Sequence, residues 1–337
     1  MDKQDIQKAI QTILTVNMNI QPGERAIIVA DTPRPEDWMG PNSQLNELIQ
    51  RAVMVRQMYD QAKQLFTGCQ IDFLAFPTTG QNGTEPSHEV AKKLLDYDVV
   101  LLMTTYSLTH TDARVDACKK GARVASMPGF EESMFLPGGP MLADYKQIFK
   151  ITNQWAEKLT ACNQVHILTS IGTDLTFSIE GRAGGSEHGL FHHKGEWGNL
   201  PAGEGFIAPV EGTANGRLVV PSGWYIGLKE VMVLEFNNGY VSSLTGGGEV
   251  GNQFRNLFRF GEEEFQHRRN CAELGIGTNP NAKNAENGLE AEKIGGTIHI
   301  AVGDSAHMQG MTVSDLHEDF IIPDPVVYFD RKKVMGI

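Results

Sequence analysis

The first 130 residues alternate between apolar runs and amphipathic stretches. Four apolar runs predict buried strands, at residues 25–30, 71–76, 99–103 and 122–126. Stretches with apolar residues at helical spacing predict helices at residues 2–18, 45–66, 85–95 and 112–120. Such alternation is typical of an α/β domain with a mostly parallel sheet.

The pattern changes after a long amphipathic helix predicted at residues 141–161. From there on, short strands are separated by Gly-rich turns, and one further helix is predicted between Gly251 and Arg268. The sequence therefore predicts an α/β domain over residues 1–160. A β-rich α+β domain over residues 161–337 follows, and we expect it to carry the functional site.

Residues 292–319 combine strand patterns with metal-ligand side chains. Residues 297–302 alternate, so His299 lies on the face opposite Ile298, Ile300 and Val302. His317 and Asp319 are two residues apart in the next predicted strand, at residues 316–322, and therefore share one face. Two imidazoles and a carboxylate on strand faces predict a metal site.

Composition narrows the classes of function. The 337 residues carry a net charge of −12, which argues against a nucleic-acid or anionic-membrane surface. No apolar run is long enough to span a bilayer, and the N-terminal residues show no signal-peptide pattern. The four cysteines are scattered without paired spacing, which favours free thiols in a cytoplasmic protein. No Gly-rich nucleotide-binding motif follows the predicted strands.

Five motifs in order give the chain a family resemblance. They read LPAGE, APVEGTANG, AELGIGTNP, EKIGGTIHIAVG and SDLHEDFII. Their order resembles the C-terminal half of the thermophilic metallo-aminopeptidases, aminopeptidase T and aminopeptidase S. The resemblance is clear over residues 165–322 and looser before them. It implies a pair of divalent metal ions, and it implies five ligands: Glu204, Glu273, His299, His317 and Asp319.

The chain departs from that family in two ways. The family's active-site Tyr position holds Ala306 here, with His307 beside it, so His307 is the candidate catalytic residue that polarises the substrate. The segment between His299 and His317 is also shorter. This shorter form is similar to the 2,5-dihydroxypyridine dioxygenases, which use a single iron.

One set of ligands therefore allows two mechanisms. All five ligands can hold two ions of Zn, Co or Mn, which activate water for amide hydrolysis, and this aminopeptidase-like function is the favoured one. The alternative is a ring-cleaving dioxygenase with one Fe(II) held by His299, His317 and Asp319.

The substrate is expected to be a small peptide or another small molecule. His110 follows a buried strand of the α/β domain, where parallel sheets present ligands, and is the candidate substrate-binding residue. The family resemblance implies a homodimer or a larger homo-oligomer.

Overall fold

The computed structural model describes residues 2–336. The chain divides into two compact units. Unit 1 contains the residues up to Lys146 together with Gly189–Ala202, and unit 2 contains Gln147–His188 and the residues from Gly203 onwards. None of the helices in residues 2–336 is both long and apolar enough to cross a membrane.

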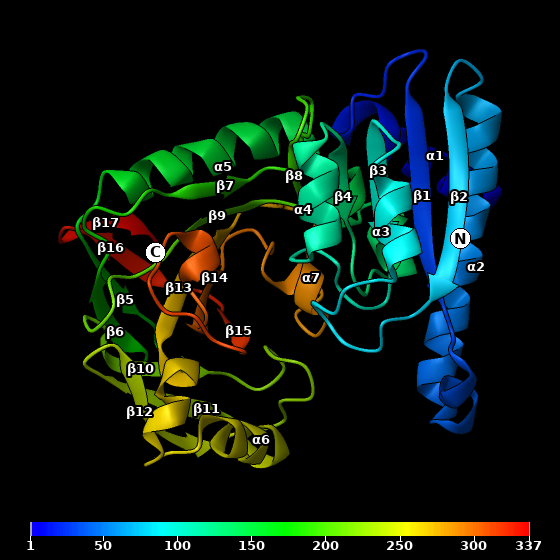
Figure 1. Cartoon of the computed structure of the whole chain (residues 1–337). Coiled ribbons are helices and arrows are strands. Elements are labelled where there is room, and N and C mark those ends of the chain that lie inside the picture. The colour runs from blue at the N-terminus through cyan, green and yellow to red at the C-terminus, as the bar shows by residue number, and fades with distance from the viewer. Residues whose placement is uncertain (1, 337) are drawn as a thin grey trace. The chain divides into compact units, whose positions relative to one another are not determined.

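Unit 1 is built on a parallel sheet with the strand order β2-β1-β3-β4-β8 (Figure 1). Its strands are β1 (Arg25–Thr32), β2 (Gln70–Pro77), β3 (Val99–Met103), β4 (Arg123–Ser126) and β8 (Trp197–Asn199). Every residue of β3 is buried, as its unbroken apolar sequence predicts. The parallel sheet predicted for this half of the chain is therefore confirmed.

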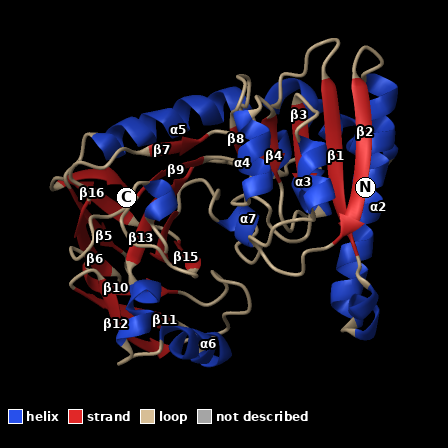
Figure 2. Ribbon diagram, in the orientation of Figure 1, coloured by secondary structure: helices blue, strands red, loops and turns tan. Residues whose placement is uncertain are grey.

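Helices flank the sheet of unit 1 (Figure 2). They are α1 (Lys3–Thr12, continued by a π-helical turn at Ile13–Asn17), α2 (Asn42–Leu65), α3 (His88–Leu94) and α4 (Asp112–Lys119). The apolar sides of α3 and α4 pack with Ile27, Val29 and Val100 in one core. Helix α3 begins later than predicted because the Ser87 side chain accepts a hydrogen bond from the Val90 amide and caps the helix.

Unit 2 contains two antiparallel sheets. The seven-stranded sheet consists, in spatial order, of β12 (Tyr240–Gly246), β11 (Met232–Asn237), β10 (Asn215–Val220), β6 (Asp174–Ser178), β5 (Gln164–Leu168), β16 (Val326–Phe329) and β17 (Lys332–Met335). The five-stranded sheet consists of β15 (His317–Ile322), β14 (Ile298–Gly303), β13 (Cys271–Gly277), β9 (Glu204–Ile207) and β7 (Gly185–Glu187). Strands β5 and β6 form an antiparallel hairpin whose turn contains Gly172.

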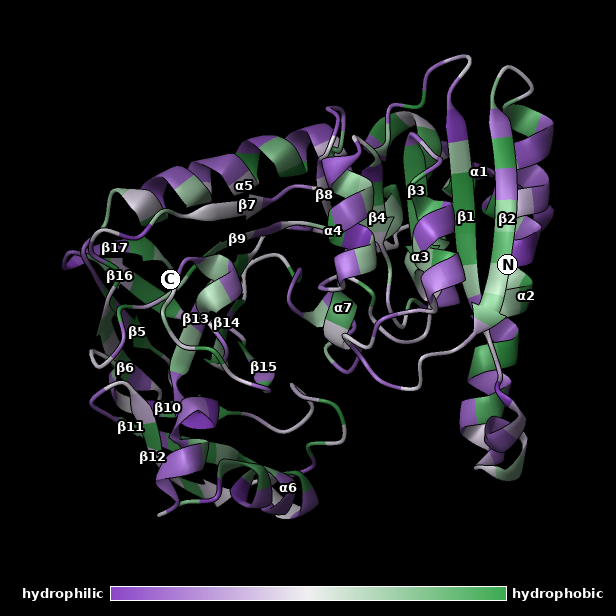
Figure 3. Ribbon diagram, viewed as in Figure 1, coloured by the Kyte–Doolittle hydropathy of each residue, from purple (hydrophilic) through white to green (hydrophobic). Residues whose placement is uncertain are grey.

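One core joins the two sheets of unit 2. Its members alternate along the strands, so that Leu274, Ile298 and Phe320 are buried together with side chains of the seven-stranded sheet. The helices of this unit are most of α5 (Tyr145–Thr160), α6 (Gly248–Phe258) and α7 (Gly288–Ala291). Figure 3 shows β13 and β14 in the colours of apolar residues along much of their length. Polar side chains can therefore lie on the opposite face of the five-stranded sheet.

One strand that matters for the site was not among those predicted from the sequence. Glu273 lies in this strand, β13, whose seven residues are all buried. The division of the chain at residue 160 stays a prediction. In the structure unit 1 ends at Lys146, and the segment 189–202 rejoins it because β8 pairs with β4.

Candidate metal centre

Strand register places the predicted ligands on one face of the five-stranded sheet. In the β13–β14–β15 ladder, Ala301 is opposite both Glu273 and Asp319. Two pairs further along, His299 is opposite Gly275. Because side chains alternate along a strand, these residues face away from the core that Leu274 and Ile298 enter. Figure 1 shows the three strands side by side.

A β-bulge brings Glu273 to this face. The register between β13 and β14 shifts between Cys271 and Glu273. Cys271 is buried in the apolar core, and two residues later Glu273 faces the other way, which regular alternation does not allow. The extra residue, Ala272, thus allows the Glu273 carboxylate to reach the ligand face while Cys271 stays in the core.

Gly275 makes room for His299. A Cβ atom at Gly275 would lie 2.0 Å from both Cε1 and Nε2 of His299, and 2.8 Å from Oε1 of Glu204. The imidazole therefore occupies the space that any other side chain would fill, which explains the Gly in the AELGIG motif.

The five predicted ligands are gathered within hydrogen-bonding and ion-pairing distances. Nε2 of His317 lies 3.1 Å from Oε2 of Glu273. Nε2 of His299 lies 3.0 Å from Oε1 of Glu204 and 3.7 Å from Oε1 of Glu273. Oδ1 of Asp319 lies 3.8 Å from Nε2 of each imidazole.

Two overlapping groups have the geometry of a cation site. Glu273, His317 and Asp319 form one group, and Glu204, Glu273 and His299 form the other; within each group the ligand atoms lie within 4.8 Å of one another. Buried Oδ1 of Asp319 has no hydrogen-bond partner among residues 2–336. A buried carboxylate oxygen without a donor is costly, so these residues fit a bound metal ion.

The electrostatics of the cluster favour positive charge. Burial lowers the pKa of His317, but the charges of Asp319 and Glu273 outweigh it and raise that pKa to about 10. Burial likewise opposes protonation of His299, yet the charge of Glu204 raises its pKa well above the usual value. Burial, followed by the nearby charge of Glu292, raises the pKa of Asp319. Protons or a divalent cation can supply the positive charge that this cluster attracts.

The structure adds a buried lysine that the sequence did not single out. The side chain of Lys293 is 2% exposed. Its ammonium group lies 2.6 Å from Oε2 of Glu187 and 2.8 Å from Oε2 of Glu292, and it also contacts Oε2 of Glu204. Glu204 thus faces an imidazole with one oxygen and an ammonium with the other. In the sequence, Lys293 stands just before the pair Gly295–Gly296, and nothing in this pattern indicates that its side chain is buried.

His307 lies next to the cluster, in a 3₁₀ turn at Ala306–Met308. Its ring centroid is 5.0 Å from that of His317, and its Nδ1 lies 2.6 Å from Oδ2 of Asp304. The predicted catalytic residue therefore borders the predicted ligands, and its catalytic role stays a prediction.

His110 belongs to unit 1. It is exposed in the turn before α4, and its ring is nearly perpendicular to that of Trp197 at a centroid distance of 6.0 Å. Its predicted role in substrate binding stays a prediction.

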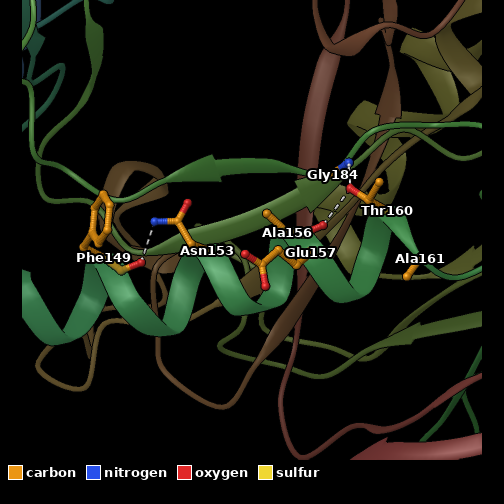
Figure 4. A pocket seen from close by; sticks show the side chains of 7 residues that line it. All are labelled: Phe149, Asn153, Ala156, Glu157, Thr160, Ala161 and Gly184. Carbon is orange, nitrogen blue, oxygen red and sulfur yellow. Dashed lines mark hydrogen bonds between the residues drawn. The ribbon is translucent and has the colours of Figure 1, made fainter.

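A groove also lies elsewhere in unit 2. It has a volume of about 570 Å³ and runs along α5, between Phe149 and Gly184 (Figure 4). None of the predicted ligands lines it. The cluster on the sheet, rather than this groove, is therefore the candidate functional site.

Comparisons with known proteins indicate that the chain is similar to enzymes. A curated 2,5-dihydroxypyridine 5,6-dioxygenase from Pseudomonas putida is 23% identical over 191 residues, which are 52% of this chain and 54% of that protein. The chain thus spans about half the length of this relative.

Two solved structures share the fold. The structure of 2,5-dihydroxypyridine dioxygenase from Pseudomonas putida matches with a TM-score of 0.72 at 16% identity, over 100% of this chain and 96% of that one. Wild-type AmpT from Thermus thermophilus matches with a TM-score of 0.62 at 14% identity, over 99% of this chain and 98% of that one. The family model described as 2,5-dihydroxypyridine 5,6-dioxygenase matches residues 14–336, so the chain belongs to the 2,5-dihydroxypyridine 5,6-dioxygenase family.

Proposed function

We propose that this protein is a metal-dependent dioxygenase that opens a dihydroxylated pyridine ring at a single Fe(II). The alternative mechanism from the sequence is thus preferred to the two-metal hydrolase. Family membership over residues 14–336 supports this choice, whereas the likeness to AmpT concerns the fold.

The ligand group of Glu273, His317 and Asp319 carries the proposal. These side chains would hold an ion from one face. His299, predicted from the sequence to bind the iron with His317 and Asp319, lies 3.8 Å from the unpartnered oxygen of Asp319. His317 and Asp319 are partly exposed, with side-chain exposures of 26% and 18%. A bound Fe(II) would keep open positions on this exposed side for O₂ and for the oxygens of a hydroxylated ring.

His307, oriented by Asp304, would exchange a proton with a hydroxyl group of the substrate ring. The Asp304 carboxylate accepts the hydrogen on Nδ1 of His307, which leaves Nε2 as the nitrogen that exchanges a proton with a ring hydroxyl. When a ring hydroxyl loses its proton, the electron density of the ring increases. The reaction of the ring with O₂ requires this higher electron density.

The test uses protein loaded with Fe(II) without air and then mixed with 2,5-dihydroxypyridine and O₂. The expected result is uptake of one O₂ per ring, with loss of the ring's absorbance. His317→Ala should abolish uptake. His166→Ala removes an exposed imidazole of β5 that pairs with Asp174 of β6, and this control should retain the activity.

Amide hydrolysis at two ions is the second candidate. The observation in its favour is the second ligand group, in which Glu204 and His299 stand beside Glu273. Cleavage of an amino-acid anilide without O₂, together with two metal ions per chain and no O₂ uptake, would establish this candidate and overturn the dioxygenase.

A further inference from the structure

Two carboxylates next to the ligand cluster require a cation between them. Glu187 of β7 and Glu204 of β9 are direct partners in the antiparallel register. Like charges directly opposite each other destabilise a strand pair, and Glu204 is 5% exposed, so water screens little of this repulsion.

The ammonium group of Lys293 meets this requirement. It contacts Oε2 of Glu187, of Glu204 and of the neighbouring Glu292. An ammonium group has three hydrogens to donate, and each of the three carboxylates can accept one. Lys293 is thus a resident cation held by oxygen ligands from two strands and from its own turn.

This position adjoins the metal ligands. Glu204 contacts Lys293 with Oε2 and lies 3.0 Å from Nε2 of His299 with Oε1. His299 in turn lies 3.8 Å from the unpartnered oxygen of Asp319. A second ion at Glu204 would compete with the ammonium group for the same carboxylates, and it would add two positive charges where one is already present.

We infer that Lys293 occupies a second cation subsite and thereby limits the centre to one metal ion. The inference rests on the proposed single-metal function. It also assigns Glu204 to the lysine subsite, so that Glu273, His317, Asp319 and His299 remain for the metal. Removal of the ammonium group should then uncover a second site with Glu187, Glu204 and Glu292 as ligands, suited to a divalent ion that prefers oxygen.

The test is the number of Mn²⁺ ions bound per chain, measured by elemental analysis after equilibrium dialysis against Mn²⁺ alone. Wild-type protein should bind one ion. Lys293→Ala should bind two, whereas Lys293→Arg keeps the positive charge and should bind one. The number of bound ions does not depend on substrate or O₂.

A combined variant covers the case in which Lys293→Ala does not fold. Lys293→Ala with Glu187→Gln removes one positive and one negative charge, and it keeps Glu204 and Glu292 for the ion. Two bound ions in this variant support the inference, and one overturns it.

The outcomes separate the inference from the proposed function. Two ions in wild-type protein would overturn both the single-metal function and the role of Lys293. One ion in wild-type protein and one in every Lys293 variant would overturn the role of Lys293 alone. Failure of the ring-cleavage assay, with ion counts as expected, would affect only the proposed reaction.

Discussion

The imidazoles of His307 and His317 lie edge to face, with ring centroids 5.0 Å apart and planes at 76°. Asp304 holds both rings. Its carboxylate lies 2.6 Å from Nδ1 of His307, and its backbone carbonyl lies 2.8 Å from Nδ1 of His317. Because a carboxylate and a carbonyl only accept, each imidazole carries a hydrogen on Nδ1. Nε2 of His317 is therefore the nitrogen left for a metal.

Asp304→Asn is predicted to lower kcat by about 10- to 100-fold while the metal content stays unchanged. The substitution leaves the backbone carbonyl that holds His317 and removes the carboxylate that orients His307. Steady-state kinetics and metal analysis of the same preparation check this result.

His307→Ala is predicted to lower kcat by about 100-fold or more and to change KM less, since it removes the proton-exchanging group. The double variant His307→Ala/Asp304→Asn should be no slower than His307→Ala, because Asp304 acts through His307. Additive losses in the double variant would show that the two residues act independently.

Gly275→Ala is predicted to displace His299 and to destabilise the fold by about 1–3 kcal/mol, since the added methyl group overlaps the imidazole. Metal binding should weaken as well, because His299 is one of the candidate ligands. Gly288→Ala is the matched control, because a Cβ atom there meets nothing within 4 Å. Unfolding curves and metal titrations of both variants test this, and equal behaviour of the two would contradict the packing argument.

Glu273→Gln is predicted to weaken metal binding by about 100-fold or more, because loss of a direct ligand should exceed the 10- to 100-fold effect of an outer partner. Glu204→Gln should weaken it less, since Oε2 of Glu204 is engaged by Lys293. Calorimetric titration with Mn²⁺ compares the two. The opposite order would assign Glu204, rather than Glu273, to the metal.

Asp31→Asn is predicted to gain stability relative to the wild type as the pH rises. Burial raises the pKa of Asp31, although the amide and hydroxyl of Thr105 donate hydrogen bonds to it. The protonated form is therefore favoured by folding. Its stabilisation is complete below pH 3.8, the unfolded value, and is lost as the pH rises through the higher folded pKa.

The stability difference between Asp31→Asn and the wild type should change steadily in favour of Asp31→Asn between pH 4 and pH 8. Urea unfolding across this range measures it. Asp116→Asn, at an exposed position of α4, serves as the control and should follow the wild type at every pH. A constant difference between Asp31→Asn and the wild type would remove the ionisation of Asp31 as the cause.

The sequence allowed the sheet positions of three ligands to be predicted, because alternation is a local property. His299 stands among three aliphatic residues of the other parity, and His317 and Asp319 are two residues apart, so β14 and β15 could be recognised. The order of buried strands and helices in unit 1 was predictable for the same reason.

The features of the fold and of the site that were not predicted depend on contacts between residues distant in the sequence. Strand β13 was missed because Gly275 and Gly277 weaken a strand pattern, yet Gly275 is required by the His299 ring on the neighbouring strand. Lys293 resembled an ordinary surface lysine, since its partner Glu187 is 106 residues away. Strand β8 has three residues and is recognisable only through its pairing with β4.

The two faces of the β13–β14–β15 ladder restrict how this chain can change in length during evolution. A one-residue insertion within β14 would turn His299 towards the core and Ile298 or Ile300 towards the ligands, so folding and chemistry would be lost together. The bulge before Glu273 is the position at which β13 accommodates one additional residue. Lineages of this protein should therefore vary in length in the connecting loops, while these three strands keep their residue spacing.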